Sequence, residues 1–348
     1  MTTSTPPLRN RARHGPFAWV GAFTGFYPAT AADVADVGPV TSFLYAARSV
    51  ILVISAQSAL IAGVLAATDR RFETVPFILA MLAFIVLHAI SNLSNDYFGY
   101  RRGHDTADSP RRRYTLHPVA SGAFTMRFLT VGLAVLVAIV TLIAVYFTAL
   151  RGWGAVWLAV AGAVLLWAYD AAPRALKELG LGEVAAFVVW GPLMIGGGYY
   201  VITGAWSAMA FIASVPYGLG VASILIGKHI DQRAFDAAHR QRTLPVLLGA
   251  TASRRLNIAV VLAMYAAVAV GIGLGALSLA VLVVLVAAPR AVHAVRVMAR
   301  PSPSAPPPGY VGWPLWFHRV CLVHNRAYGW LFIAGLAIGA IWPATRIG

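Results

Sequence analysis

Long apolar runs recur along the whole chain, and short polar or basic connections separate them. An apolar run of about 18 or more residues can cross a hydrocarbon core of roughly 30 Å as an α-helix. Apolar residues make up 59% of the 348 residues and charged residues only 11%, which leaves too few polar side chains to solvate a soluble globule. The sequence therefore predicts an all-α integral membrane protein.

Length and apolarity predict about nine transmembrane helices. They are expected at residues 41–67, 75–95, 126–149, 153–169, 184–203, 206–227, 256–274, 276–288 and 328–342. Residues 1–40 are predicted to form a polar cytoplasmic segment, and residues 41–348 a single transmembrane domain with a proline-rich linker at 301–309. An odd number of spans places the two termini on opposite sides of the membrane.

The formal net charge of +15 comes from arginines and lysines that lie between the apolar runs. This distribution differs from the basic amphipathic face of a nucleic-acid-binding protein, so nucleic acid is not expected as a partner. Lys and Arg stay on the cytoplasmic side during insertion. We therefore expect a prokaryotic plasma-membrane protein whose N-terminus and long basic loops lie in the cytoplasm.

Two long connections, at residues 96–122 and 228–249, follow a similar pattern. Each carries an aspartate near its start and closes on a basic residue, a proline and a glycine. The two connections are four spans apart, which favours a duplicated four-helix unit with both copies facing the same side. We therefore expect the two connections to meet in space.

The first connection begins with oxygen-bearing side chains at helical spacing. Asn92 and Asp96 are four residues apart and share one helix face, Asn95 lies beside them, and Asp105 can fold back from the loop. Carboxylate and amide oxygens suit Mg²⁺, which completes its shell with water and substrate phosphate. The alternative interpretation is a helix cap followed by a solvated turn.

The second connection contains Asp231 and Asp236 among basic residues that include Lys228 and Arg233. Carboxylates that hold Mg²⁺ and bases that hold phosphate together suit a polyanionic substrate at a membrane edge. The alternative is a solvated loop with compensating charges. Motifs of zinc proteases, P-loop proteins and dinucleotide-binding proteins are absent, and the nearly uncharged middles of the spans disfavour a transporter.

These motifs resemble those of the UbiA superfamily of intramembrane prenyltransferases, which have about nine helices. The resemblance rests on Asn95-Asp96-Tyr97, Gly103, Asp105, Asp231, Asp236 and Arg242-Thr243-Leu244, with support from Arg48, Tyr169, Pro173, Leu176, Gly180-Leu181-Gly182-Glu183, Gly191-Pro192-Leu193 and Tyr199-Tyr200. It covers roughly residues 48–249 and is closest to the dihydroxynaphthoate prenyltransferases of menaquinone synthesis.

The resemblance implies Mg²⁺-dependent transfer of a polyprenyl group from a prenyl diphosphate to a small aromatic acceptor, with release of pyrophosphate. The implied metal ligands are Asn92, Asn95, Asp96, Asp105, Asp231 and Asp236, the implied diphosphate-binding residues are Arg48, Arg113, Lys177, Lys228 and Arg242, and the implied catalytic residues are Asp96, Asp231, Asp236 and Lys177. The prenyl tail is expected among the spans, in contact with the lipid bilayer.

Three positions depart from the pattern of the naphthoate branch. Gly99 stands where an aspartate is usual, Asp231 and Asp236 are five rather than four residues apart, and Lys228-His229 replaces a pair of asparagines. Two alternatives therefore stay open. One is a UbiA-type terpene cyclase acting on a prenyl diphosphate, and the other, of a different class, is a non-catalytic membrane carrier or scaffold.

Overall fold

The computed structural model describes residues 18–24, 38–114, 117–310 and 312–342, and their regular structure is helical with no β-strand among them. The α-helices are α1 (Ala18–Thr24), α3 (Pro39–Ala46), α4 (Ser49–Thr68), α5 (Thr74–Arg101), α6 (Pro110–Tyr114), α7 (Met126–Arg151), α8 (Trp153–Leu166), α9 (Gly182–Val188), α10 (Gly197–Thr203), α11 (Ala208–Ala238), α12 (Leu244–Leu248), α13 (Ala250–Gly273), α14 (Ala288–Met298) and α15 (Phe317–Ile341). Short π or 3₁₀ segments are η1 (Trp167–Ala171), η2 (Leu176–Leu179), η3 (Val189–Gly196) and η4 (Leu279–Ala287).

Eight helical segments in the described part of the chain are long and apolar enough to cross a membrane. Several are composite: α8 continues into η1, η4 into α14, and α9, η3 and α10 form one span around Pro192. The expected ninth span falls in α15, a 25-residue helix whose first half carries polar side chains and lowers its hydropathy. The prediction of an all-α membrane bundle is confirmed, and nine is an approximate count.

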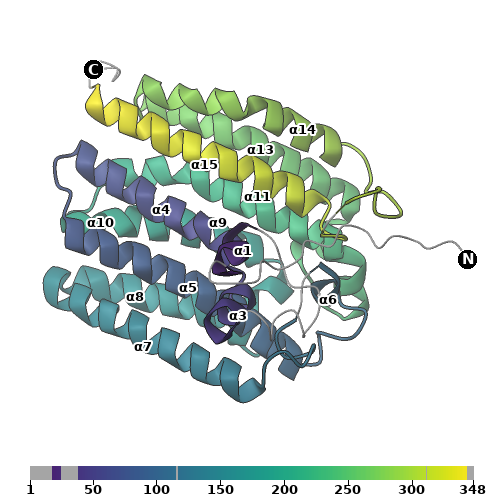
Figure 1. The fold of residues 1–348 in the computed structure, drawn as a ribbon. Coiled ribbons are helices and arrows are strands. Elements are labelled where there is room, and N and C mark those ends of the chain that lie inside the picture. Colours follow the sequence, from purple (N-terminus) through teal and green to yellow (C-terminus); the bar gives the residue numbers. More distant parts are fainter. Residues whose placement is uncertain (1–17, 25–37, 115–116, 311, 343–348) are drawn as a thin grey trace, which may run out of the picture.

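The long helices run alongside one another, with α13 and α14 on one side of the bundle and α7 and α8 on the other (Figure 1). The largest buried apolar cluster joins α4, η3, α11, α13, η4, α14 and α15. A second cluster joins α4, α5, α7 and α10. Helices α1, α3 and α6 gather at one end of the bundle, which is also the end that carries the site described below (Figure 1).

The first predicted span is interrupted at Arg48. This residue separates α3 from α4 and has φ 56° and ψ 49°, in the left-handed region. That conformation costs an L-residue about 1–2 kcal/mol. The prediction of one unbroken helix over residues 41–67 is wrong, because apolarity alone does not show where the backbone breaks.

Two predicted boundaries also differ. Helix α5 continues through Arg101 and α11 through Ala238, so Asp96, Asp231 and Asp236 lie on helices and not in loops. A helix satisfies its own backbone hydrogen bonds and need not end where the apolar run ends. The predicted turn near Gly275 is present, with that glycine at φ 71°.

The predicted polar segment at residues 1–40 is described only in part. Within it, α1 packs against α3 and α4. Residues 1–17, 25–37 and 343–348 lie outside the described residues, so the sidedness of the two termini stays a prediction. The proline-rich linker at 301–309 contains no helix.

Candidate functional site

A cavity of about 970 Å³ lies between α4, α5, α7, α8, η3, α11 and α15. Ligand pockets usually measure about 300–1,000 Å³, so this cavity can hold a long apolar chain. Its lining is mostly apolar, but polar and charged side chains gather at one end. We call this set the polar end of the cavity: Arg48, Asn92, Asn95, Tyr114, Tyr169, Lys228, His318 and Arg319.

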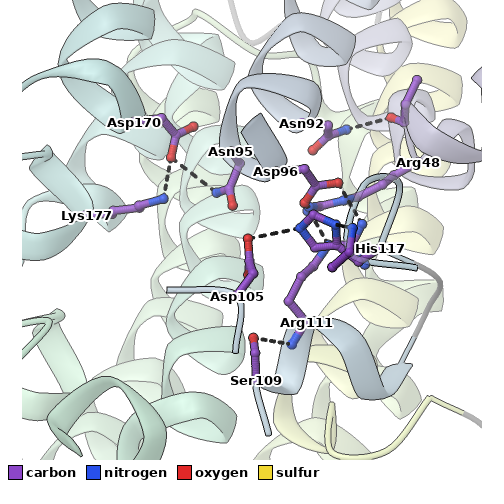
Figure 2. Close-up of polar contacts among 12 residues, drawn as sticks. Arg48, Asn92, Asn95, Asp96, Asp105, Ser109, Arg111, His117, Asp170 and Lys177 are labelled. Atoms are coloured by element: carbon purple, nitrogen blue, oxygen red, sulfur yellow. Dashed lines mark hydrogen bonds and ion pairs between the residues drawn. The ribbon is translucent and has the colours of Figure 1, made fainter. Parts of the chain in front are cut away.

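Asp96 on α5 is the anionic centre beside the polar end. Its carboxylate is 0% exposed and accepts hydrogen bonds from two guanidinium groups. Arg111 on α6 donates from Nε to Oδ1 at 2.8 Å and from Nη2 to Oδ2 at 2.7 Å, and Arg48 donates from Nη2 to Oδ1 (Figure 2). This contact compensates for the left-handed backbone of Arg48.

Two arginines on one aspartate leave an excess of positive charge. Burial disfavours the charged form of Arg111, but the neighbouring Asp96 carboxylate outweighs burial and raises the pKa of Arg111 above its usual range. Lys228 and Arg319 add further cationic groups to the cavity lining. In a low-dielectric setting such a group of cations attracts an anionic ligand strongly.

Asp170 is a second buried carboxylate, which the sequence analysis missed. It is 0% exposed on η1, and its Oδ1 accepts from Lys177 Nζ at 2.5 Å and from Asn95 Nδ2 at 3.2 Å (Figure 2). Its Oδ2 is buried without a hydrogen-bond partner among the described residues. An acidic residue at the end of an apolar run, directly after Tyr169, was the available signal.

Asp105 folds back onto α5, as the sequence analysis expected. Its Oδ2 lies 3.0 Å from His117 Nε2, and a side chain at Gly99 would collide with the same carboxylate (Figure 2). Asp105 thus fills the space beside Gly99, the position where the resemblance led us to expect an aspartate. Asn92 donates to Ala47 O at 2.9 Å and fastens α5 to the junction of α3 and α4.

Asp231 and Asp236 on α11 have different surroundings. The Asp231 carboxylate accepts from the backbone N–H groups of Phe317 at 3.0 Å and His318 at 2.9 Å, so it caps the start of α15. Asp236 is buried and accepts from Thr243 Oγ1 at 3.1 Å. Within the described residues neither aspartate is hydrogen-bonded or ion-paired to a partner of Asp96, so the expected single carboxylate cluster is not seen there.

The capping contact predicts a specific phenotype. Asp231→Ala should lower the free energy of unfolding by about 1 kcal/mol, as the loss of a helix cap does, and should leave the Mg²⁺ requirement of turnover unchanged. Thermal unfolding in detergent and an Mg²⁺ titration measure the two effects. Ser207→Ala, which removes the cap of α11 at Ala210 N, is the matched control. A raised Mg²⁺ requirement with unchanged unfolding would contradict this assignment.

The other predicted diphosphate-binding residues are not equally placed. Arg48 and Lys228 line the cavity. Lys177 does not line it, and donates a hydrogen bond to Asp170 Oδ1, the oxygen that also accepts from Asn95. Arg113 and Arg242 are exposed to solvent. Sequence reasoning gave no role to Arg319, which lines the cavity from α15. It also missed the buried pair of His229 Nδ1 and Glu183 Oε1, 2.7 Å apart.

The described residues contain no group of three or more His, Cys, Asp or Glu side chains placed to hold a metal unaided. Oxygen ligands are nevertheless abundant around Asp96, in the form of Asn92, Asn95 and Asp105, and Asp170 offers an unpartnered oxygen. Such a set suits a hard cation that takes the rest of its ligands from water and substrate.

Comparison with known proteins gives a consistent picture. The UbiA prenyltransferase family matches residues 55–320. The chain is 27% identical over 199 residues to a 1,4-dihydroxy-2-naphthoate octaprenyltransferase from Haemophilus influenzae, covering 54% of this chain and 62% of that protein. It is 27% identical over 220 residues to a 2-carboxy-1,4-naphthoquinone phytyltransferase from Synechocystis, covering 63% and 70%. The chain thus aligns with just under two thirds of the first relative.

Two solved structures share the fold. A UbiA homologue from Aeropyrum pernix in its apo form has a TM-score of 0.59 at 20% identity, covering 82% of this chain and 97% of that one. A UbiA homologue from Archaeoglobus fulgidus bound to GPP and Mg²⁺ has a TM-score of 0.53 at 14% identity, covering 84% and 98%.

Proposed function

The chain belongs to the UbiA prenyltransferase family, and on that premise we propose that it transfers a prenyl group from a prenyl diphosphate to a small aromatic acceptor within the membrane. The observation that carries the proposal is the cavity itself, which joins a long apolar interior to a cationic end beside a buried aspartate. Such a cavity matches a donor with an apolar tail and an anionic head.

The cationic end promotes departure of the diphosphate. The allylic C–O bond of the donor breaks, and the bonding electron pair leaves with pyrophosphate. Arg48 and Lys228 line the cavity where that negative charge develops, and preorganised cations stabilise it without reorganisation. An aromatic carbon of the acceptor then bonds to the allylic carbon, and the ring loses a proton.

The apolar interior binds the prenyl tail. Each buried methylene contributes about 0.8 kcal/mol relative to water, so a long tail holds the donor firmly. The two relatives described above are named for naphthalene-type acceptors, which supports an acceptor of that class, as used in menaquinone synthesis. The basic residues around the site support an active site that opens on the cytoplasmic side of a prokaryotic plasma membrane.

Asn92, Asn95, Asp96 and Asp105 are the residues that would hold Mg²⁺, and Asp236 stays a candidate. The structure of the Archaeoglobus homologue with GPP and Mg²⁺ supports metal use. When bound, the ion neutralises charge on the diphosphate. Asp96 Oδ1 accepts two guanidinium hydrogen bonds and Oδ2 accepts one, so Oδ2 keeps a lone pair that could hold the ion while both arginines stay in place.

The purified protein should convert a prenyl diphosphate and a dihydroxynaphthoate into a prenylated aromatic plus pyrophosphate, and chelation of divalent metal should abolish turnover. Mass spectrometry of the products is the measurement. A cyclic hydrocarbon or alcohol formed without acceptor would identify a terpene cyclase. Absence of turnover across donors of several lengths would favour the carrier or scaffold.

A further inference from the structure

Three polar side chains from three spans meet in the apolar part of the cavity wall. His88 on α5 lies two turns before Asp96, Ser55 lies on α4, and Trp190 lies on η3. Ser55 Oγ is 3.0 Å from His88 Nδ1 and accepts from Trp190 Nε1 at 2.9 Å. The His88 and Trp190 rings are 5.0 Å apart at 74°. We call these residues the His88 triad.

The hydrogen bonds within the triad leave one imidazole nitrogen without a partner. An indole N–H only donates, so Ser55 accepts from Trp190 and engages His88 at Nδ1. His88 Nε2 has no hydrogen-bond partner among the described residues, and His88 lines the cavity. Packing between the helices explains the hydrogen bond at His88 Nδ1. It gives no role to Nε2.

An imidazole nitrogen without a partner in an apolar membrane cavity is costly, so a polar ligand atom is expected opposite it. The prenyl tail offers no polar atom. The diphosphate is placed with the cations of the polar end, and His88 is eight residues, about 12 Å, deeper along α5 than Asp96. Arg48 and His88 line the same cavity, and His88 shares α5 with Asp96, so the triad lies on the apolar side of the polar end.

We propose that His88 Nε2 binds a ring hydroxyl of the aromatic acceptor, and that the Trp190 ring packs against the acceptor ring. This inference rests on the proposed function, because it assigns the acceptor site of that reaction. Both residues line the cavity, and Ser55 fixes the orientation of both. The triad thus selects a hydroxylated aromatic over the lipid tails that share the cavity.

His88→Leu should weaken the binding of 1-hydroxy-2-naphthoate roughly tenfold, which corresponds to the loss of one buried hydrogen bond. The binding of 2-naphthoate, which lacks the hydroxyl, should not change. His88→Gln keeps a donor and an acceptor and should restore part of the affinity. Quenching of tryptophan fluorescence in detergent micelles measures binding without any need for turnover.

His324→Leu is the matched control. His324 is also buried on a long helix and bonded to a hydroxyl, Tyr265 Oη at 2.9 Å, but it does not line the cavity. This variant should bind both naphthoates like the wild type. In the transfer assay, His88→Leu should raise the KM for the acceptor roughly tenfold and leave the KM for the prenyl diphosphate unchanged.

Binding and turnover separate the two proposals. If the wild type binds the hydroxynaphthoate and His88→Leu does not, the acceptor site stands even when no transfer is seen, and the proposed function fails alone. If wild type and His88→Leu bind the hydroxynaphthoate equally, the acceptor site is overturned even when transfer proceeds. If the wild type binds neither naphthoate, it is overturned as well.

Discussion

Asp96→Asn should lower turnover by about 10²–10³-fold, the usual effect of removing one preorganised electrostatic contact from an active site. The carboxylate is fully buried and accepts three guanidinium hydrogen bonds, from Arg48 and Arg111. The substitution also leaves Arg48 and Arg111 without their counter-charge, which costs about 3–5 kcal/mol of folding free energy. Activity should therefore be measured per folded molecule, with the folded fraction taken from size-exclusion chromatography.

Asp108→Asn is the matched control for that experiment. Asp108 belongs to the same connection but is exposed, and its carboxylate accepts from Thr106 Oγ1 at 2.6 Å. It should retain near-normal activity and stability. Near-normal Mg²⁺-dependent turnover by folded Asp96→Asn would remove this aspartate from the mechanism.

Two substitutions of Arg48 should have the same effect on activity but different effects on stability. Both Arg48→Gly and Arg48→Ala remove a guanidinium from the polar end of the cavity, and each should lower turnover about 100-fold. Glycine adopts the left-handed backbone without cost, whereas alanine pays about 1 kcal/mol, so the glycine variant should unfold at the higher temperature. Thermal unfolding and turnover of the two variants test both statements.

Arg240 provides a control with the same backbone. It has φ 57° at the end of α11 and is exposed. Arg240→Gly should therefore be as stable as the wild type or more so, and should keep its activity. An active Arg48→Gly variant would show that Arg48 serves the backbone break alone.

The number and place of the spans followed from the sequence because apolar length is the dominant requirement of a bilayer. The interruption at Arg48 did not, because its partner Asp96 lies 48 residues further along the chain, where local sequence does not show the contact. Likewise, the continuation of α11 beyond residue 227 depends on backbone hydrogen bonds, which hydropathy does not measure.

The candidate site was predictable to a similar degree. Local spacing on one helix placed Asn92, Asn95 and Asp96 together, and the structure shows all three on the same stretch of α5. Asp170 escaped notice because one of its partners, Asn95, lies 75 residues away on α5. The contact of Asp231 with the start of α15 could not be predicted from local sequence either, because that helix begins 86 residues later.

The binding of a non-reactive prenyl thiodiphosphate tests the central claim most directly, namely that the polar end of the cavity binds a metal-associated diphosphate beside Asp96. Calorimetric titration of the protein in nanodiscs should show binding that requires Mg²⁺ and that is weakened at least about tenfold in Asp96→Asn and Arg48→Gly. Asp108→Asn should bind like the wild type. Equal affinity in the wild type and in folded Asp96→Asn, with or without Mg²⁺, would contradict the account.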